Sequence, residues 1–342
     1  MARGRSCGSA MAAGRFAGLL AGAVALAAMT GCPPKAAPVD PAAAAAATEA
    51  AERAAERAAA ERAEAERFIA DCVAAQDERA GKLASFEAFA AVRLRYTDEN
   101  GPQEDQLDGA IYLAPGSKGA FDLKLLGERW AWLGGDGVQS WVYLAPPKRP
   151  SVLHVYDRLV DGAATDAAEA VGSAELTLLT PASLRLLLGI APIGRDAETV
   201  LVGAAPAPIH ERCAVRFSPS AKTRAEIEFT ADRLPRRIVV RAIDGTEIVR
   251  ADLASFERVR LPDVALGGWP AVPTSVAMEA ARSKAGATIL IDKERLQGVR
   301  RRARPEFFDL GELQAYLMPA EVVVHAADAH GNGAAATGAG AP

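Results

Sequence analysis

The sequence has few of the residues and motifs that usually mark an active site. Its 342 residues include four cysteines, four histidines and 6% aromatic residues. It has no CxxC pair and no Cys/His cluster, which argues against a zinc site. No GxSxG, P-loop, HExxH or Rossmann fingerprint occurs in a strand–helix setting. The net charge of −4 lacks the basic excess of a nucleic-acid-binding domain. We therefore expect no enzyme activity, no metal or other cofactor, and no nucleic-acid partner.

The few reactive side chains do not form a recognisable catalytic group. His154 lies in an alternating apolar segment, and His210 and Glu211 come shortly before Cys213. Neighbours in sequence do not make a catalytic triad, which depends on spatial geometry. Cys72 and Cys213 are expected outside the cytoplasm, where disulfides persist. Two alternatives stay open for them: a bridge that pins the N-terminal helix to the sheet, or two free thiols.

Residues 1–31 have the organisation of an export signal. Arginines precede an uninterrupted apolar stretch at 16–29, which is too short for a comfortable membrane span. The stretch ends in Met-Thr-Gly-Cys at Cys32, which resembles the lipobox of bacterial lipoproteins. The resemblance implies cleavage before Cys32 and acylation with palmitate-type chains, each buried CH₂ contributing roughly 0.8 kcal/mol to membrane binding. Pro33 replaces the Asp that favours inner-membrane retention, so we expect an anchor in the outer membrane, facing the periplasm.

A Pro/Ala spacer at 32–41 leads to a helical arm at 42–79. The arm is almost entirely Ala, Glu and Arg, which are strong helix formers, with opposite charges four residues apart. Residues 42–73 could contact a protein partner or peptidoglycan as a coiled coil, or serve only as a solvated spacer. Further along, several larger apolar residues fall at roughly helical spacing and are expected to pack on a sheet: Phe68, Ile69, Cys72, Val73, Leu83, Phe86 and Phe89.

Residues 80–325 are expected to form a β-rich domain. Alternating apolar residues and turn signals every eight to twelve residues predict short antiparallel strands. The predicted strands are 92–96, 107–113, 121–125, 129–133, 138–144, 152–156, 213–217, 224–229, 236–243, 247–253, 288–292 and 320–325. Helices are predicted at 274–284 and 308–317, and the Ala/Gly-rich tail at 326–342 is expected to be disordered.

A leucine-rich helix is predicted after Thr180-Pro181. Thr serves as the N-cap, Pro occupies the first helical position, and Gly189 ends the helix. With four leucines in five residues, it is apolar nearly all round and is expected to plug the concavity of the sheet. The candidate residues for lining a ligand cavity come from this helix and from three tryptophans of the strands: Leu184, Leu187, Leu188, Trp130, Trp132 and Trp141. Ordinary core packing is the alternative for each of them.

Four segments together resemble the LolA/LolB-type lipoprotein carrier and receptor superfamily. They are GAIYLAPGSKGAFDLKLLG, ERWAWLGGDGVQSWVYLAP, LTP before the leucine helix, and RIVVRAIDGTEIVRADLASFERV. The positions that carry the resemblance are Leu113, Pro115, Leu126, Gly127, Asp136, Gly137 and Trp141. The resemblance covers about residues 80–260, and it includes neither an arginine matching the carrier's release switch nor an exposed leucine loop of the receptor kind.

The resemblance implies an α+β fold: a curved antiparallel sheet, an unclosed half-barrel, with helices covering its concave face and a long helix before it. It also implies binding of a hydrophobic ligand in the concavity, either a lipoprotein acyl chain or a phospholipid. The alternative is a non-enzymatic scaffolding lipoprotein that contacts a protein partner or peptidoglycan through its helical arm.

Overall fold

This computed structural model describes residues 41–98, 101–116, 118–145, 149–156, 181–203, 206–261, 264–296 and 307–325. The predicted export signal, Cys32, residues 33–40 of the spacer and the C-terminal tail lie outside these ranges. Acylation of Cys32 therefore stays a prediction. None of the helices in the described ranges has both the length and the apolar character of a membrane span.

One sheet contains fourteen strands, in the order β14-β6-β5-β4-β3-β2-β1-β13-β12-β11-β10-β9-β8-β7. The strands are β1 (Phe86–Asp98), β2 (Gly101–Ala114), β3 (Lys118–Leu125), β4 (Glu128–Gly135), β5 (Ser140–Leu144), β6 (Val152–Tyr156), β7 (Glu198–Leu201), β8 (Cys213–Ser220), β9 (Thr223–Phe229), β10 (Pro235–Ala242), β11 (Glu247–Arg258), β12 (Ala271–Ala280), β13 (Gly286–Ile291) and β14 (Glu321–His325). The helices are α1 (Pro41–Lys82), α4 (Pro181–Leu187), α5 (Ile209–Arg212) and α6 (Leu310–Leu317), with 3-10 turns η1 (Leu266–Gly268) and η2 (Lys293–Arg295).

The sheet consists of two halves that meet at β1. This strand pairs with β2 on one side and β13 on the other, so β1–β6 with β14 form the first half and β7–β13 the second. Neighbouring strands are antiparallel except β14, which runs parallel to β6 at one edge. The other edge is β7, so the curved sheet does not close. The predicted α+β fold with an unclosed antiparallel sheet and a long N-terminal helix is confirmed.

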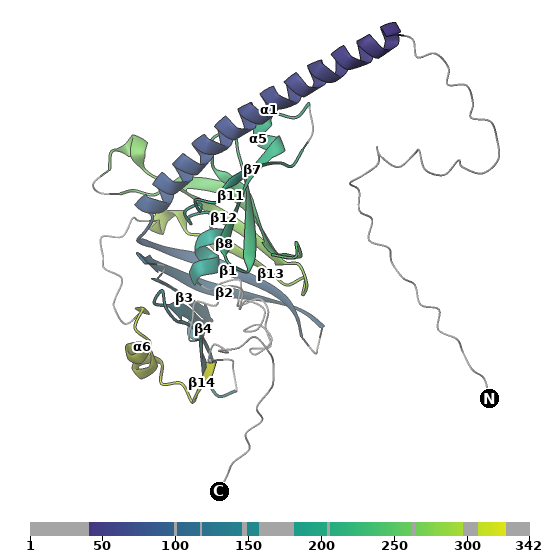
Figure 1. Cartoon of the computed structure of the whole chain (residues 1–342). Coiled ribbons are helices and arrows are strands. Elements are labelled where there is room, and N and C mark those ends of the chain that lie inside the picture. Colours follow the sequence, from purple (N-terminus) through teal and green to yellow (C-terminus); the bar gives the residue numbers. More distant parts are fainter. Residues whose placement is uncertain are drawn as a thin grey trace, which may run out of the picture. The chain divides into compact units, whose positions relative to one another are not determined.

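The main core lies on the concave face of the sheet. Alternate residues of each strand point to one face, and those of both halves join a single apolar cluster. Phe121 of β3 and Phe217 of β8 belong to this cluster although they come from opposite halves. Leucines of α4 complete it, and Figure 1 shows the strands curving around this short teal helix. The core therefore lies between the sheet and its covering helices.

Helix α1 contacts the sheet through its C-terminal part. The buried side chains Ala65, Ile69, Cys72, Gln76 and Arg79 recur every three or four residues, which places them on one side of the helix. From residue 42 to residue 60 every side chain is exposed. The chain divides into two units between Arg57 and Ala58, and the buried residues of α1 named above belong to the second unit. The predicted long helix is therefore confirmed, and only its later turns belong to the core.

Two local predictions are wrong, and one strand was not predicted. Phe86 and Phe89 belong to β1, because α1 ends at Lys82 and the chain turns directly into a strand. The segment predicted as a helix at 274–284 is mostly β12, whose pairing with β11 and β13 on both sides outweighs its helix-forming Ala and Met residues. Strand β7 was not predicted, since its four residues are too few to show alternation.

Candidate functional site

The concave interior holds the apolar surface that the sequence predicts as a ligand cavity. Leu184 and Leu187 of α4, and Leu188 directly after it, are buried in the main core cluster with side chains from both halves of the sheet. Gly189 follows them with a φ of 63°, a conformation that favours glycine and lets the chain leave the helix. The predicted leucine helix and its end are thus confirmed, and the three leucines occupy the space that a ligand would need.

Polar side chains of α1 hold the chain that follows α4. Gln76 is fully buried, and its Nε2 donates to the carbonyl oxygens of Gly189 at 2.9 Å and Ala191 at 2.7 Å. Arg79 donates through Nη2 to the same Gly189 oxygen at 2.8 Å and also to Gln76 Oε1. Gly189 and Ala191 lie just beyond α4, so these bonds fix the segment that follows α4 to α1.

Arg185 holds α4 to the first half of the sheet. Its Nη2 donates to the carbonyl oxygens of Ala114 at 2.5 Å, Ala84 at 3.2 Å and Lys118 at 3.2 Å. Burial lowers the pKa of Arg185 to about 10, and burial lowers that of Arg79 to about 10 as well. Gln76, Arg79 and Arg185 were not predicted as site residues. The burial of Gln76 could have been predicted from the sequence, because Gln76 follows Ile69 and Cys72 at the spacing of three or four residues that marks the buried side of α1.

The three candidate tryptophans do not share a face of the sheet. Trp130 is half-buried against the main core cluster, whereas Trp132 and Trp141 are buried in a second cluster on the outer face. The reason is a β-bulge: Leu123 pairs with Ala131 and Lys124 with Arg129, so Trp130 has no partner and the alternation of β4 is reversed there. Of the three candidates, Trp130 therefore contacts the main core cluster, whereas Trp132 and Trp141 belong to the second cluster.

The second cluster is covered by α6. Phe308 and Leu313 pack there with Trp132, and the ring of Phe307 meets Trp132 edge-on with 5.2 Å between centroids. Trp141 lies over Gly134, where a Cβ would come 2.1 Å from the indole nitrogen, so only glycine fits. These tryptophans act as core residues of the outer face, which is the alternative considered from the sequence.

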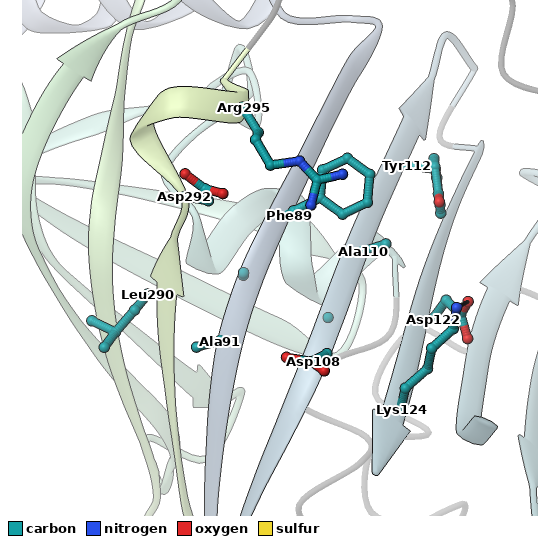
Figure 2. Close-up of a pocket in the computed structure, with 12 residues that line it drawn as sticks. Phe89, Ala91, Asp108, Ala110, Tyr112, Asp122, Lys124, Leu290, Asp292 and Arg295 are labelled. Carbon is teal, nitrogen blue, oxygen red and sulfur yellow. Dashed lines mark ion pairs between the residues drawn. The ribbon is translucent and has the colours of Figure 1, made fainter. Parts of the chain in front are cut away.

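A pocket of about 550 Å³ opens on the outer face of β13, β1, β2 and β3 (Figure 2). Its lining includes Ala91 and Ala110, and charged residues such as Asp108, Asp292 and Arg295 surround them. The Arg295 guanidinium lies 3.6 Å from the centroid of the Phe89 ring. This mixed, open lining offers little apolar enclosure for an acyl chain. We therefore assign no ligand to it.

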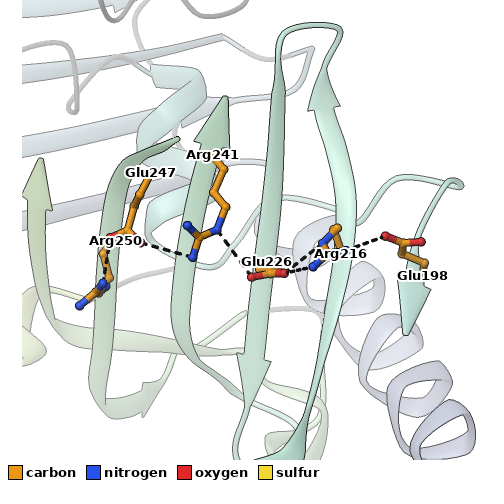
Figure 3. A network of polar contacts seen from close by, with 6 residues as sticks. All are labelled: Glu198, Arg216, Glu226, Arg241, Glu247 and Arg250. Carbon is orange, nitrogen blue, oxygen red and sulfur yellow. Dashed lines mark hydrogen bonds and ion pairs between the residues drawn. The ribbon is translucent and has the colours of Figure 1, made fainter. Parts of the chain in front are cut away.

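A ladder of ion pairs crosses the outer face of β7–β11 (Figure 3). Arg216 reaches Glu198 at 3.2 Å and Glu226 at 2.5 Å, and Arg241 connects Glu226 to Glu247. Arg250 adds a contact to Glu247 at 2.9 Å. The hydrogen bond to Glu226 raises the pKa of Arg216 against the opposing effect of burial, and the charges of Glu226 and Glu198 add to it. The charges satisfy one another and leave no concentrated charge for a ligand.

Cys72 and Cys213 are both buried and both free thiols. Burial, and then the nearby Cys213, raises the pKa of Cys72 to about 12. The Cys213 thiol donates to the carbonyl of Ile209 at 3.0 Å, and burial raises its pKa as well. Of the two alternatives, the structure shows the free thiols, and a bridge formed under oxidising conditions stays a prediction. Both thiols are poor nucleophiles, since the thiolate is the reactive form.

Within the described ranges, no three His, Cys, Asp or Glu side chains gather closely enough to hold a metal ion. His210 lies 3.8 Å from Glu211, its neighbour in sequence. No known family profile matches the sequence, and no curated protein matches it.

Three solved structures are similar to the chain at low sequence identity. A LolA superfamily protein from Nitrosomonas europaea has 14% identity and a TM-score of 0.40, over 68% of this chain and 96% of its own. A DUF1329 family protein from Desulfovibrio piger has 10% identity and a TM-score of 0.45, over 72% and 99%. A domain from Vibrio parahaemolyticus, named for outer membrane lipoprotein sorting, has 12% identity and a TM-score of 0.42, over 74% and 99%. With TM-scores below 0.5, these likenesses do not establish a function, and the proposal below depends on the chain's own geometry.

Proposed function

We propose that this protein is a lipid-anchored protein of the cell envelope that binds a hydrophobic ligand in the concavity of its sheet. The ligand is a lipoprotein acyl chain or a phospholipid, and the anchor is acylated Cys32 in the outer membrane, with the β domain facing the periplasm. The observation that carries the proposal is the apolar concave face filled by Leu184 and Leu187 of a seven-residue helix and by Leu188 directly after it.

The physical support is the small size of the element that fills the concavity. A helix of two turns has little stability of its own and depends on tertiary packing. Helix α4 presents leucine side chains to the sheet, and an acyl chain offers the same kind of apolar surface. Exchange of one for the other loses little apolar burial. Ligand entry by displacement of α4 is therefore energetically accessible.

Lipid binding is tested first by mass spectrometry of lipids that co-purify with the full chain. The second measurement is a titration with N-phenyl-1-naphthylamine, a neutral fluorescent probe of apolar sites. Replacing Leu187 by Ala leaves room beside α4 and should change the affinity for this probe several-fold. The matched control is Leu266→Ala, because Leu266 is exposed on η1. A folded protein with no co-purified lipid and no bound probe would contradict the proposal.

The scaffolding alternative concerns residues 42–73 of α1. Their charges pair along the helix itself, Arg53 with Glu49 at 2.8 Å and Arg62 with Glu66 at 3.0 Å. Such internal pairing favours a solvated spacer over a docking surface. Deletion of residues 42–60 separates the two: lipid binding should survive it, whereas capture of a protein partner or of peptidoglycan would be lost.

A further inference from the structure

Two arginines next to α4, the buried Arg79 and the half-buried Arg185, have no acidic partner. Arg79 is only 6% exposed, and Arg185 extends from α4 itself to the first half of the sheet. Every hydrogen bond described above for them goes to a neutral acceptor, a backbone carbonyl or the amide of Gln76. No ion pair involves either guanidinium within the described ranges. The Nε atoms of both side chains are also buried and without partners.

Arg212 is a buried arginine that does have an acidic partner. It is 9% exposed, similar to Arg79, but it forms an ion pair with Glu61. Burial alone lowers the pKa of Arg79 and Arg185, with no carboxylate to oppose it. A buried cation without a counter-ion is costly, so most buried charges in proteins are paired. The concave side of this domain therefore carries two uncompensated positive charges at the helix that fills it.

We propose that Arg79 and Arg185 bind the anionic head group of the ligand. The inference depends on the proposed function and narrows its ligand to an acyl-chain amphiphile that carries a carboxylate or a phosphodiester. Displacement of α4 would take away the Gly189 carbonyl, which Arg79 now contacts, and would break the contacts of Arg185 with the sheet. A guanidinium left without these carbonyls binds anionic oxygens in paired, charge-assisted hydrogen bonds. A neutral ester or alcohol supplies a weaker acceptor and leaves the charge uncompensated.

The test compares ligands of equal chain length that differ in head-group charge. Palmitate and hexadecanol each displace N-phenyl-1-naphthylamine from the purified full chain, and the ratio of their affinities is the readout. We expect palmitate to bind about tenfold more tightly or better, the effect of hydrogen bonds to a charged group. The same affinity ratio is measured for phosphatidylglycerol and diacylglycerol. Comparison of the two ratios shows whether the site prefers the phosphodiester of a phospholipid or the carboxylate of a free fatty acid.

The double variant Arg79→Met/Arg185→Met should bring the palmitate preference close to one while hexadecanol still binds. The matched control is Arg233→Met, because Arg233 is exposed and pairs with Asp71 at 2.9 Å. Its preference should equal that of the wild type. The single variants give intermediate ratios, and they serve if thermal unfolding shows that the double variant does not fold.

Equal affinity for palmitate and hexadecanol in the wild type would overturn the head-group inference and leave hydrophobic binding intact. An unchanged ratio in the folded double variant would overturn it as well, and the two arginines would then only fix α4. Failure of all four ligands to displace the probe would overturn the proposed function together with the inference.

Discussion

The outer faces of the two halves of the sheet are completed in different ways. On the first half, Trp132 and Trp141 are buried beneath α6 in an apolar cluster. On the second half, the ladder from Glu198 to Arg250 crosses five strands at the surface. Burial of an aromatic side chain contributes several kcal/mol to folding, whereas exposed ion pairs contribute about 0–1 kcal/mol each. We infer that α6 is needed for the stability of the first half and that the ladder mainly keeps the second half solvated.

The largest effect is expected from Trp132→Ala. The side chain is 1% exposed, so its loss leaves a cavity under α6 and should lower the free energy of unfolding by about 3–5 kcal/mol. Denaturant unfolding measures the change. Leu290→Ala is the control, since Leu290 lies half-exposed on the outer face of β13 and should cost less than about 1 kcal/mol. Equal effects would show that the covered face is no more important than the exposed one.

Two arginine substitutions compare how much an arginine–carboxylate pair contributes to stability on each half of the sheet. Arg129 donates to both oxygens of the buried Asp122, at 2.8 and 3.0 Å, whereas Arg216 serves the exposed ladder. Burial opposes the charge of Arg129, but the hydrogen bonds and charges of Asp122 and Tyr316 outweigh it and raise its pKa. Arg129→Met removes both hydrogen bonds from a carboxylate that is 5% exposed, with Lys124 Nζ still 3.8 Å away, and should cost about 3 kcal/mol. Arg216→Met should cost about 1 kcal/mol or less by the same unfolding measurement. A reversed order would overturn the comparison.

The ladder itself is tested by Glu226→Gln. Glu226 contacts both Arg216 and Arg241, so the substitution removes the central charge of the ladder and should cost about 0.5–1 kcal/mol at low salt. Because exposed charges are screened, the difference from the wild type should shrink in 1 M NaCl. Unfolding curves at both salt concentrations give the result, and Glu104→Gln, which loses one exposed contact to Arg93, is the control. A salt-independent loss would mean that the ladder is held by packing.

The sequence predicts most strands because they alternate, and it predicts α4 because its leucines stand between Pro181 and Gly189. It does not predict the face of each tryptophan, because the bulge at Trp130 reverses the alternation and depends on pairing with β3. The helix predicted at 274–284 fails for a related reason. Strand β12 is stabilised by pairing with β11 and β13 on both sides, and the helix-forming residues of the segment itself do not show this pairing.

The candidate site is predicted only in its apolar part. A run of leucines with only one polar residue among them indicates burial. Leu184, Leu187 and Leu188 could therefore be predicted from the sequence. Arg79 and Arg185 could not, because arginine is common on exposed helix surfaces and α1 carries many such residues. Arg79 contacts Gly189, which lies 110 residues further along the chain, and Arg185 contacts Ala84, Ala114 and Lys118. Long-range packing therefore decides the polar part of the site.

The smallest effect is expected at the two edge strands of the sheet, β14 and β7, when the pH is changed. At the edge of the first half, His154 Nδ1 and His325 Nε2 lie 3.1 Å apart and join β6 to β14, whereas an ion pair between Arg216 and Glu198 joins β8 to β7 at the other edge. Burial, and then the charge of His325, lowers the pKa of His154 below its ordinary value of 6.5.

The unfolded chain therefore binds the proton more readily than the folded chain does. The stability that this contact contributes is present above pH 6.5 and is lost as the pH falls through the folded pKa of His154. Hydrogen exchange, corrected for intrinsic rates, should show β14 losing protection between pH 7 and pH 5 while β7 changes little. His154→Gln should abolish the pH dependence at β14, and the same pH dependence in this variant would show that the histidine pair does not hold the edge.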